Sequence, residues 1–226
     1  MDIFKLSQSL DELIFDVLMW VIFYPYTLVR VLIWPGYMID YAAAELKKDP
    51  DKEELFDRGL SPPVFLFLSI VLAWMISPAA PEVAQSGSET AIAGLINGSV
   101  MSLLTYRLAL YGVFPFAGAL IYEWRTPGGI SQHSFRQPFY QQAYLCAPLA
   151  IVFSIAAVVA ARIEDIDVLA FMLLAMLIIL IWYFWSQIVF FRRTMDSGWA
   201  AATFWGFLSV CLGITLSIGL DFIVGA

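Results

Sequence analysis

Residues 168–191 read VLAFMLLAMLIILIWYFWSQIVFF, a stretch without a single charged side chain. A helix rises about 1.5 Å per residue and the hydrocarbon layer of a bilayer is about 30 Å thick, so one span needs about 20 apolar residues. This stretch is therefore predicted to cross a membrane as one helix. Arg192 and Arg193 follow it directly, which is typical of the cytoplasmic end of a span.

Four other apolar runs extend this prediction to the rest of the chain. Residues 91–122, 143–161 and 199–223 each reach the length of a span. The run from Pro62 to Ile76 is shorter, and becomes adequate if residues 77–80 lie at the membrane interface. We therefore predict an all-α fold, a polytopic transmembrane helical bundle with five spans.

The composition agrees with a membrane protein and argues against several other classes. Hydrophobic residues make up 61% of the chain and charged residues 14%, against roughly a quarter charged in ordinary soluble domains. The net charge of −7 argues against nucleic acid as a partner, because phosphates are bound by basic surfaces. The lipid bilayer is the partner that the composition predicts.

Charge asymmetry orients the predicted spans. With the N-terminus inside, the segments between spans on the outer side hold Arg162 as their single basic residue, beside several carboxylates. Because cytoplasmic segments collect Lys and Arg, we predict a cytoplasmic N-terminus and an outward-facing C-terminus. The inner segments hold Lys5, Arg30, Lys47, Lys48, Lys52, Arg58, Arg125, Arg136, Arg192 and Arg193.

Residues 1–60 are predicted to form a cytoplasmic and interfacial region ahead of the transmembrane domain, residues 61–226. The run from Leu13 to Trp34 is apolar but is interrupted by Asp16, Pro25 and Arg30. We interpret it as two amphipathic helices that meet at Pro25 and lie in the inner interface. The alternative is a sixth span, with the N-terminus outside.

Two polar segments interrupt the apolar runs, one within each region. Residues 40–57 hold seven carboxylates and three lysines, which fits either a solvated loop or an acidic docking site for a partner. Residues 123–142 are polar and contain the turn signal Pro127-Gly128-Gly129. We expect them to form a cytoplasmic loop.

Small residues recur at spacings of three and four within the runs. Such stripes let helices approach closely in lipid, and indicate either contacts within the bundle or the interface of a homo-oligomer or of another membrane protein. The third run shows Ala147, Ala150, Ser154, Ala157 and Ala161, the fifth shows Ala202, Gly206, Ser209, Gly213 and Ser217, and the second holds the pair Gly94 and Gly98.

Arg107 is the candidate functional charge, because it lies inside an apolar run. A charge at the bilayer centre costs at least about 2.5 kcal/mol on insertion scales, so it needs a partner, a cavity or the interface. Three interpretations stay open. The side chain extends to the outer headgroups, pairs with Asp221 near the outer end of the last run, or lines a pathway for a substrate or ion.

The sequence gives little support for catalysis or for a cofactor. His133 is the one histidine and lies in a polar segment, while Cys146 and Cys211 lie in apolar runs. We find no spacing of metal ligands and no glycine pattern for nucleotide phosphates. We therefore predict a non-enzymatic protein with no cofactor, no catalytic residues and no metal site.

One short stretch resembles a known family. Ser134-Phe-Arg-Gln137, followed by Ala143-Tyr144 and then Ala147-Pro148, resembles the start of the third span in bacterial members of the Yip1 domain family. The resemblance implies five spans, a cytoplasmic N-terminus and an outward C-terminus in the bacterial inner membrane. It implies a fold and a topology, and no activity.

Two functions follow as hypotheses. The first is a membrane-organising or partner-binding subunit, favoured by the small-residue stripes and the interfacial aromatic segment. The second is a transporter or channel subunit in which Arg107 is the functional charge, because transport sites are commonly built on broken helices at mid-depth.

Overall fold

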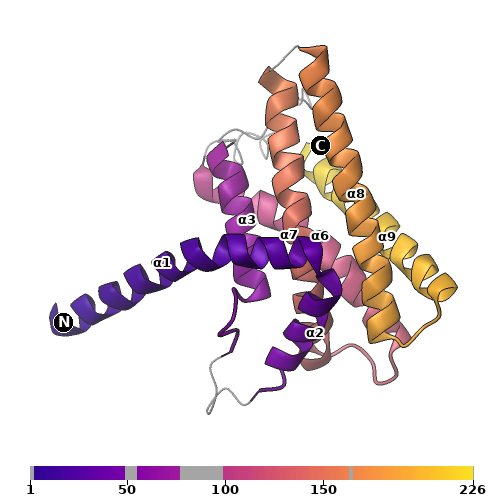
Figure 1. Ribbon diagram of the computed structural model, residues 1–226, viewed down its shortest axis with the longest axis horizontal. Helices are drawn as coiled ribbons and strands as arrows, with labels where there is room; N and C mark the ends of the chain where they lie inside the picture. The colour runs from indigo at the N-terminus through magenta and orange to yellow at the C-terminus, as the bar shows by residue number, and fades with distance from the viewer. Residues whose placement is uncertain (1–2, 49–54, 77–98, 163–164, 226) are drawn as a thin grey trace.

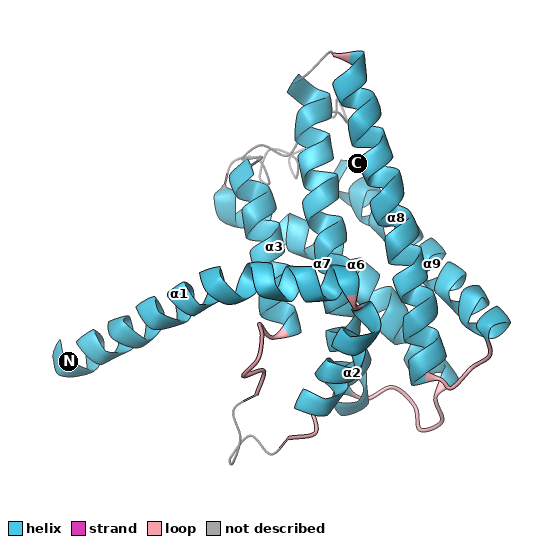
Figure 2. Cartoon of the chain, in the orientation of Figure 1, coloured by secondary structure: helices cyan, strands magenta, loops and turns pink. Residues whose placement is uncertain are grey.

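The computed structural model of the chain describes residues 3–48, 55–76, 99–162 and 165–225. Over these residues the chain is all-helical, as predicted, and contains no strand (Figure 2). The helices are α1 (Ile3–Ile33), α2 (Pro35–Glu45), α3 (Pro62–Ile76), α6 (Val100–Arg125), α7 (Gln132–Arg162), α8 (Ile166–Thr194) and α9 (Trp199–Gly225).

Four helices, α6 to α9, are long and apolar enough to cross a membrane. A fifth candidate is the bent pair formed by the second half of α1 and α2. α3 is apolar but has only 15 residues, and its predicted extension through residues 77–80 falls outside the described residues. The helices thus fit a multi-pass membrane protein with four to five candidate spans.

α7 occupies the centre of the bundle. It packs against α3, α6 and α8, and residues 141–150 are all buried. α8 and α9 lie at one side and expose large apolar side chains that water would not favour. These exposed residues include Phe171, Leu173, Leu177, Ile181, Phe204, Phe207 and Ile218.

The connections fall at two opposite ends of the bundle. Figure 1 shows α2 at the same end as the residues that join α6 to α7 and α8 to α9. The junction of α7 with α8 and the C-terminus lie toward the other end. The helices from α6 onward therefore run up and down alternately, as successive spans of a polytopic protein do.

The predicted break at Pro25 is wrong. α1 runs through Pro25 without interruption and ends at Ile33, and α2 begins at Pro35 after a bend of 120°. The backbone of Trp34 leaves the helical region, with φ −128° and ψ 62°, and Pro35 takes the first position of α2, which proline favours. A proline inside a helix removes one hydrogen bond, and at Pro25 the helix continues despite this loss.

Three side chains of the bundle bind the backbone around this bend, which explains why the chain turns there. Trp182 Nε1 donates to the carbonyl of Leu32 at 2.8 Å, and Gln141 Nε2 donates to that of Ile39 at 3.0 Å. Arg193 donates to the carbonyl of Gly36 at 3.1 Å and pairs with Asp40. Of the three carbonyls, that of Leu32 lies in the last turn of α1, where carbonyls have no helical partner and need such a donor.

The predicted loop over residues 123–142 is also mostly helical. α6 continues to Arg125 and α7 begins at Gln132, so the connection is six residues, 126–131. The first turns of α7 are polar because they lie near the end of the bundle, and polarity alone does not indicate a loop. The boundary between domains at residue 60 stays a prediction, although α2 packs against α7 and α8.

Candidate functional site

A pair of amides forms the polar centre of the bundle. Gln142 Nε2 donates to Gln187 Oε1 at 2.9 Å, and Gln187 Nε2 donates to Gln142 Oε1 at 2.7 Å. Both side chains are fully buried, and Ser209 Oγ lies 3.4 Å from Gln187 Oε1. The pair joins α7 to α8, with Ser209 contributed by α9. Reciprocal bonds of this kind satisfy both amides away from water.

Two glycines make room for this amide pair. A Cβ at Gly118 of α6 would lie 2.5 Å from the carbonyl carbon of the Gln142 amide. A Cβ at Gly206 of α9 would lie 3.3 Å from the backbone nitrogen of Ile188. The four helices α6 to α9 therefore all meet at the pair, and its arrangement suits a polar contact that holds these helices together.

The small-residue stripe of α9 faces the bundle as far as Gly213. Ala202, Gly206, Ser209 and Gly213 are buried, and Ser217 is half-buried. A Cβ at Gly213 would lie 2.7 Å from the ring of Phe114 in α6. These residues therefore serve contacts within the chain.

The stripe of α7 is described in part. Ala147, Ala150 and Ser154 are buried, and Ser154 Oγ lies 3.0 Å from the hydroxyl of Tyr111 in α6. The side chains of Ala157 and Ala161 fall outside the described residues. The pair Gly94 and Gly98 also lies outside them, so its predicted packing role is not addressed.

Arg107 is fully buried in α6. Its neighbours Tyr106 and Leu110 belong to a buried cluster against which Trp74 of α3 and Leu220 of α9 pack. The guanidinium is therefore enclosed by protein. A buried charge in a membrane needs a polar environment.

Asp221, the predicted partner of Arg107, follows Leu220 in α9. Leu220 packs beside the buried residues around Arg107, so this part of α9 lies against α6. The contacts of the Asp221 side chain fall outside the described residues. The pair Arg107–Asp221 therefore stays a prediction.

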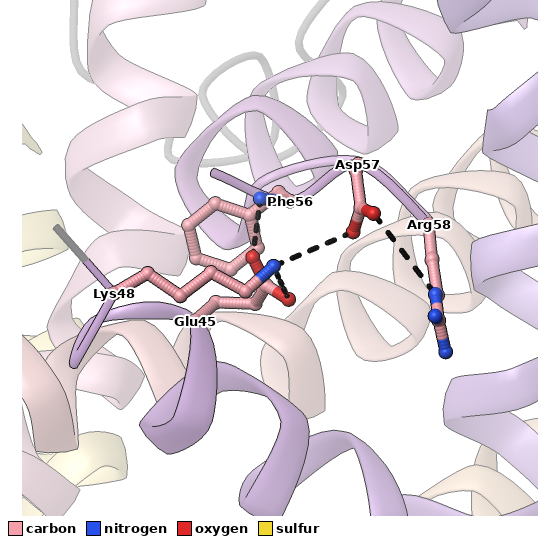
Figure 3. A network of polar contacts seen from close by, with 5 residues as sticks. All are labelled: Glu45, Lys48, Phe56, Asp57 and Arg58. Atoms are coloured by element: carbon pink, nitrogen blue, oxygen red, sulfur yellow. Dashed lines mark hydrogen bonds and ion pairs between the residues drawn. The ribbon is translucent and has the colours of Figure 1, made fainter. Parts of the chain in front are cut away.

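A second polar cluster, here called the acidic clasp, joins the end of α2 to the residues that precede α3. It consists of Glu45, Lys48, Phe56, Asp57 and Arg58 (Figure 3). Glu45 accepts a hydrogen bond from the backbone N–H of Phe56 at 2.6 Å and pairs with Lys48 at 2.7 Å. Lys48 reaches Asp57 at 3.6 Å. Part of the acidic segment thus binds its own chain.

The clasp holds Phe56 in an uncommon backbone conformation. Its φ of 62° is left-handed, which costs a residue with a Cβ roughly 1–2 kcal/mol. The buried Glu45 carboxylate fixes the N–H, and the Phe56 ring packs against Tyr41, with centroids 5.9 Å apart. A hydrogen bond to a charged group contributes about 1.5–3 kcal/mol, enough to offset the backbone cost.

Tyr144 and Thr27 fix the residues after the clasp. Tyr144 donates its hydroxyl to the carbonyl of Leu60 at 2.5 Å, while Thr27 Oγ1 accepts from the N–H of Leu60 at 3.2 Å. The chain between α2 and α3 is thereby attached to α1 and α7. Sequence reasoning missed these contacts, because they join residues 33 and 84 positions apart.

Several other residues of the site were missed by sequence reasoning. Gln142 and Glu45 were placed in polar segments, and Gly118 was not singled out. The sequence marks Arg193 only as a signal of topology. An amide at the edge of an apolar run, as at Gln142, is the one usable signal, since a buried amide needs a partner on another helix.

Comparison of the chain with protein-family models, with curated proteins and with solved structures finds no match. The likeness of residues 134–148 to the Yip1 domain family therefore rests on the short motifs alone. In the described part of the chain, no group of three or more His, Cys, Asp or Glu side chains could hold a metal ion.

Proposed function

We propose that this chain is a non-enzymatic integral membrane protein of Yip1-like five-helix architecture, with α3 as its first span. It acts as a membrane-organising or partner-binding subunit in the bacterial inner membrane. The observation that carries the proposal is the second half of α1, which exposes apolar side chains on the side turned away from the bundle.

The exposed face of α1 is continuous. At 100° per residue, residues 17, 18, 21, 22 and 29 cover about half of the circumference of the helix, and all of them are exposed and apolar. The opposite half packs against the bundle through Trp20, Phe23, Tyr24 and Leu28. Figure 1 shows α1 projecting well beyond the other helices.

An apolar face of this size needs a cover of lipid or of another protein. The bundle fixes only the second half of α1, by Trp182 and by contacts with α3 and α7. This fixed half can therefore present its outer face to a neighbouring membrane protein or a second copy. This arrangement supports organising or partner binding as the function.

The charges at the two ends of the bundle support a cytoplasmic N-terminus. Arg125, Arg136 and Arg192 lie near the connections at the α2 end, whereas Asp165 and Asp167 begin α8 at the other end. Basic residues collect on the cytoplasmic side. The proposal therefore places α2 and the acidic clasp in the cytoplasm and the C-terminus outside.

The burial of Arg107 favours one alternative, a transporter or channel subunit. An intramembrane charge inside a bundle marks ion and substrate pathways in many membrane proteins. Arg107 has this position, and α6 contains Gly112 and Pro115 within the same helix.

The two functions predict different results for Arg107→Leu. If Arg107 holds α6 against α9 through Asp221, then Asp221→Asn leaves a buried charge uncompensated and costs about 3–5 kcal/mol. We expect both variants to lower the yield of folded protein, measured by size-exclusion chromatography in detergent. The yield of Arg107→Lys should lie between that of these two variants and that of the natural chain, because lysine keeps the charge but loses the bidentate geometry.

The transporter alternative predicts a different outcome for Arg107→Leu. A pathway residue would allow Arg107→Leu to fold with normal yield and thermal stability, while an ion or substrate flux into liposomes disappears. A well-folded and selectively inactive Arg107→Leu protein would replace the partner-binding proposal by the transporter.

A further inference from the structure

A groove between α6 and α7 has a lining that is almost entirely apolar. It has a volume of about 720 Å³, within the roughly 300–1,000 Å³ of small-molecule sites. α6 contributes Phe116 and Leu120, and the connection contributes Ile130 and Ser131. One face of α7 completes the lining with Gln132, Phe135, Arg136, Phe139 and Tyr140.

The residues of the lining follow one another along the helices from the α6–α7 connection inward. Ser131 and Gln132 lie where the connection enters α7, at the α2 end of the bundle. Phe116 and Phe139 lie two turns or more from that end. Phe116 and Phe135 pack with centroids 5.5 Å apart, and Phe135 and Phe139 with centroids 6.1 Å apart, so the apolar part is built by aromatic rings.

Arg136 supplies a positive charge beside the aromatic part of the groove. Its guanidinium carbon lies 5.2 Å from the centre of the Tyr140 ring, and the side chain is exposed. Among the described residues no carboxylate forms an ion pair with it. The nearby Glu123 carboxylate is buried and accepts from Ser134 Oγ at 2.6 Å.

The start of α7 adds to this positive potential. The first N–H groups of a helix carry a partial positive charge, which favours anions. Ser131 caps this turn, because its Oγ accepts from the N–H of Ser134 and its carbonyl accepts from the N–H of Phe135. The turn therefore contributes its field, and the exposed Arg136 guanidinium supplies the donors that can bind two oxygens of a phosphate.

We propose that this groove binds a glycerophospholipid of the leaflet at the α2 end, with the phosphate at Arg136 and one acyl chain along Phe116, Leu120 and Phe139. The apolar lining of the groove matches an acyl chain, and the exposed Arg136 guanidinium matches the phosphate. The binding site requires only that the bundle is in a membrane, and it is independent of whether the chain organises partners or transports a solute.

The test measures the thermal stability of the full chain in detergent while dioleoylphosphatidylglycerol is added. A ligand that binds the folded state raises its stability by mass action. We expect the lipid to raise the unfolding temperature of the natural chain, and Arg136→Gln to weaken the apparent lipid affinity about tenfold, which corresponds to about 1.4 kcal/mol. The matched control is Arg125→Gln, since Arg125 stacks on Trp205 outside the groove.

A second pair of variants tests the apolar part. Leu120→Trp places a larger side chain in the groove and should abolish the lipid-dependent shift. Leu108→Trp changes an exposed leucine of the same helix, away from the groove, and should retain it. The lipid-free unfolding temperatures of both variants show whether each is folded before the lipid is added.

Three results would overturn the proposal. The first is that Arg136→Gln and Arg125→Gln lose the same amount of apparent lipid affinity, or that neither variant loses any. The second is a shift of the same size with dioleoylglycerol, which has no phosphate. The third is a full shift with inorganic phosphate alone, which would make the groove an anion site without a role for the acyl chain.

Discussion

Gly213→Leu is expected to lower the thermal stability of the protein strongly, whereas Gly219→Leu leaves it nearly unchanged. A Cβ at Gly213 would lie 2.7 Å from Phe114 Cδ1, a distance at which either the Phe114 ring or one of the two helices must shift. The Phe114 ring cannot swing away freely, because it packs edge-on against Tyr183 with centroids 6.1 Å apart. Overpacking of this kind typically costs roughly 1–3 kcal/mol.

Gly219 is the matched control on the same helix. Nothing lies within 4 Å of a Cβ at this position, and leucine has the higher helix propensity of the two residues. The measurement is the unfolding temperature of each variant in detergent, together with the yield of monodisperse protein. Equal effects of the two substitutions would show that α9 does not pack on α6 through Gly213.

Gln142→Leu is expected to destabilise the bundle by about 1–2 kcal/mol, and the double variant Gln142→Leu/Gln187→Leu by less. The single change leaves the buried Gln187 amide without its reciprocal partner, a loss that costs about 1–3 kcal/mol. Bonds between helices in membranes are often weaker than this, about 0.6 kcal/mol on average. Removing both amides also removes the unsatisfied group, so the double variant loses less stability than the single variant.

The measurement is a double-mutant cycle on the free energy of unfolding in mixed micelles. The two single variants and the double variant are compared with the natural chain. A positive interaction, with the double variant less destabilised than the sum of the singles, is the expected outcome. Strict additivity would mean that Gln142 and Gln187 do not bond to each other in the folded protein.

The sequence predicted the helical membrane class because that class follows from local composition. An uncharged run such as residues 168–191 has one favourable environment, and its length alone indicates a span. The stripe from Ala202 to Gly213 was also found from spacing, and its residues face the bundle. Whether it serves contacts within the chain or between chains depended on the neighbouring helix, which spacing does not identify.

Features that depend on distant parts of the chain were not predictable. Pro25 and Pro35 look alike as helix breakers, yet the chain bends at Pro35, where Trp182 binds the carbonyl of Leu32 and Arg193 that of Gly36. The first turns of α7 read as a loop because their polar residues are those of a helix end. Gln142 finds its partner 45 residues away, and no local pattern contains that information.

The accessibility of Cys146 to water tests the central claim most directly. Cys146 is fully buried in α7, one turn from Gln142, and its Sγ lies 3.2 Å from the carbonyl oxygen of Tyr111. A protein that organises partners has no need of a water-filled path through this region, whereas a transporter opens one.

The measurement is labelling by a charged, membrane-impermeant thiosulfonate in liposomes permeabilised to the reagent, with Cys211→Ser as the background. His133→Cys, at an exposed position of α7, gives the rate for a water-accessible thiol. Our account predicts that Cys146 stays unlabelled until the protein is denatured. Labelling of Cys146 in the folded protein at a rate near that of His133→Cys would contradict it.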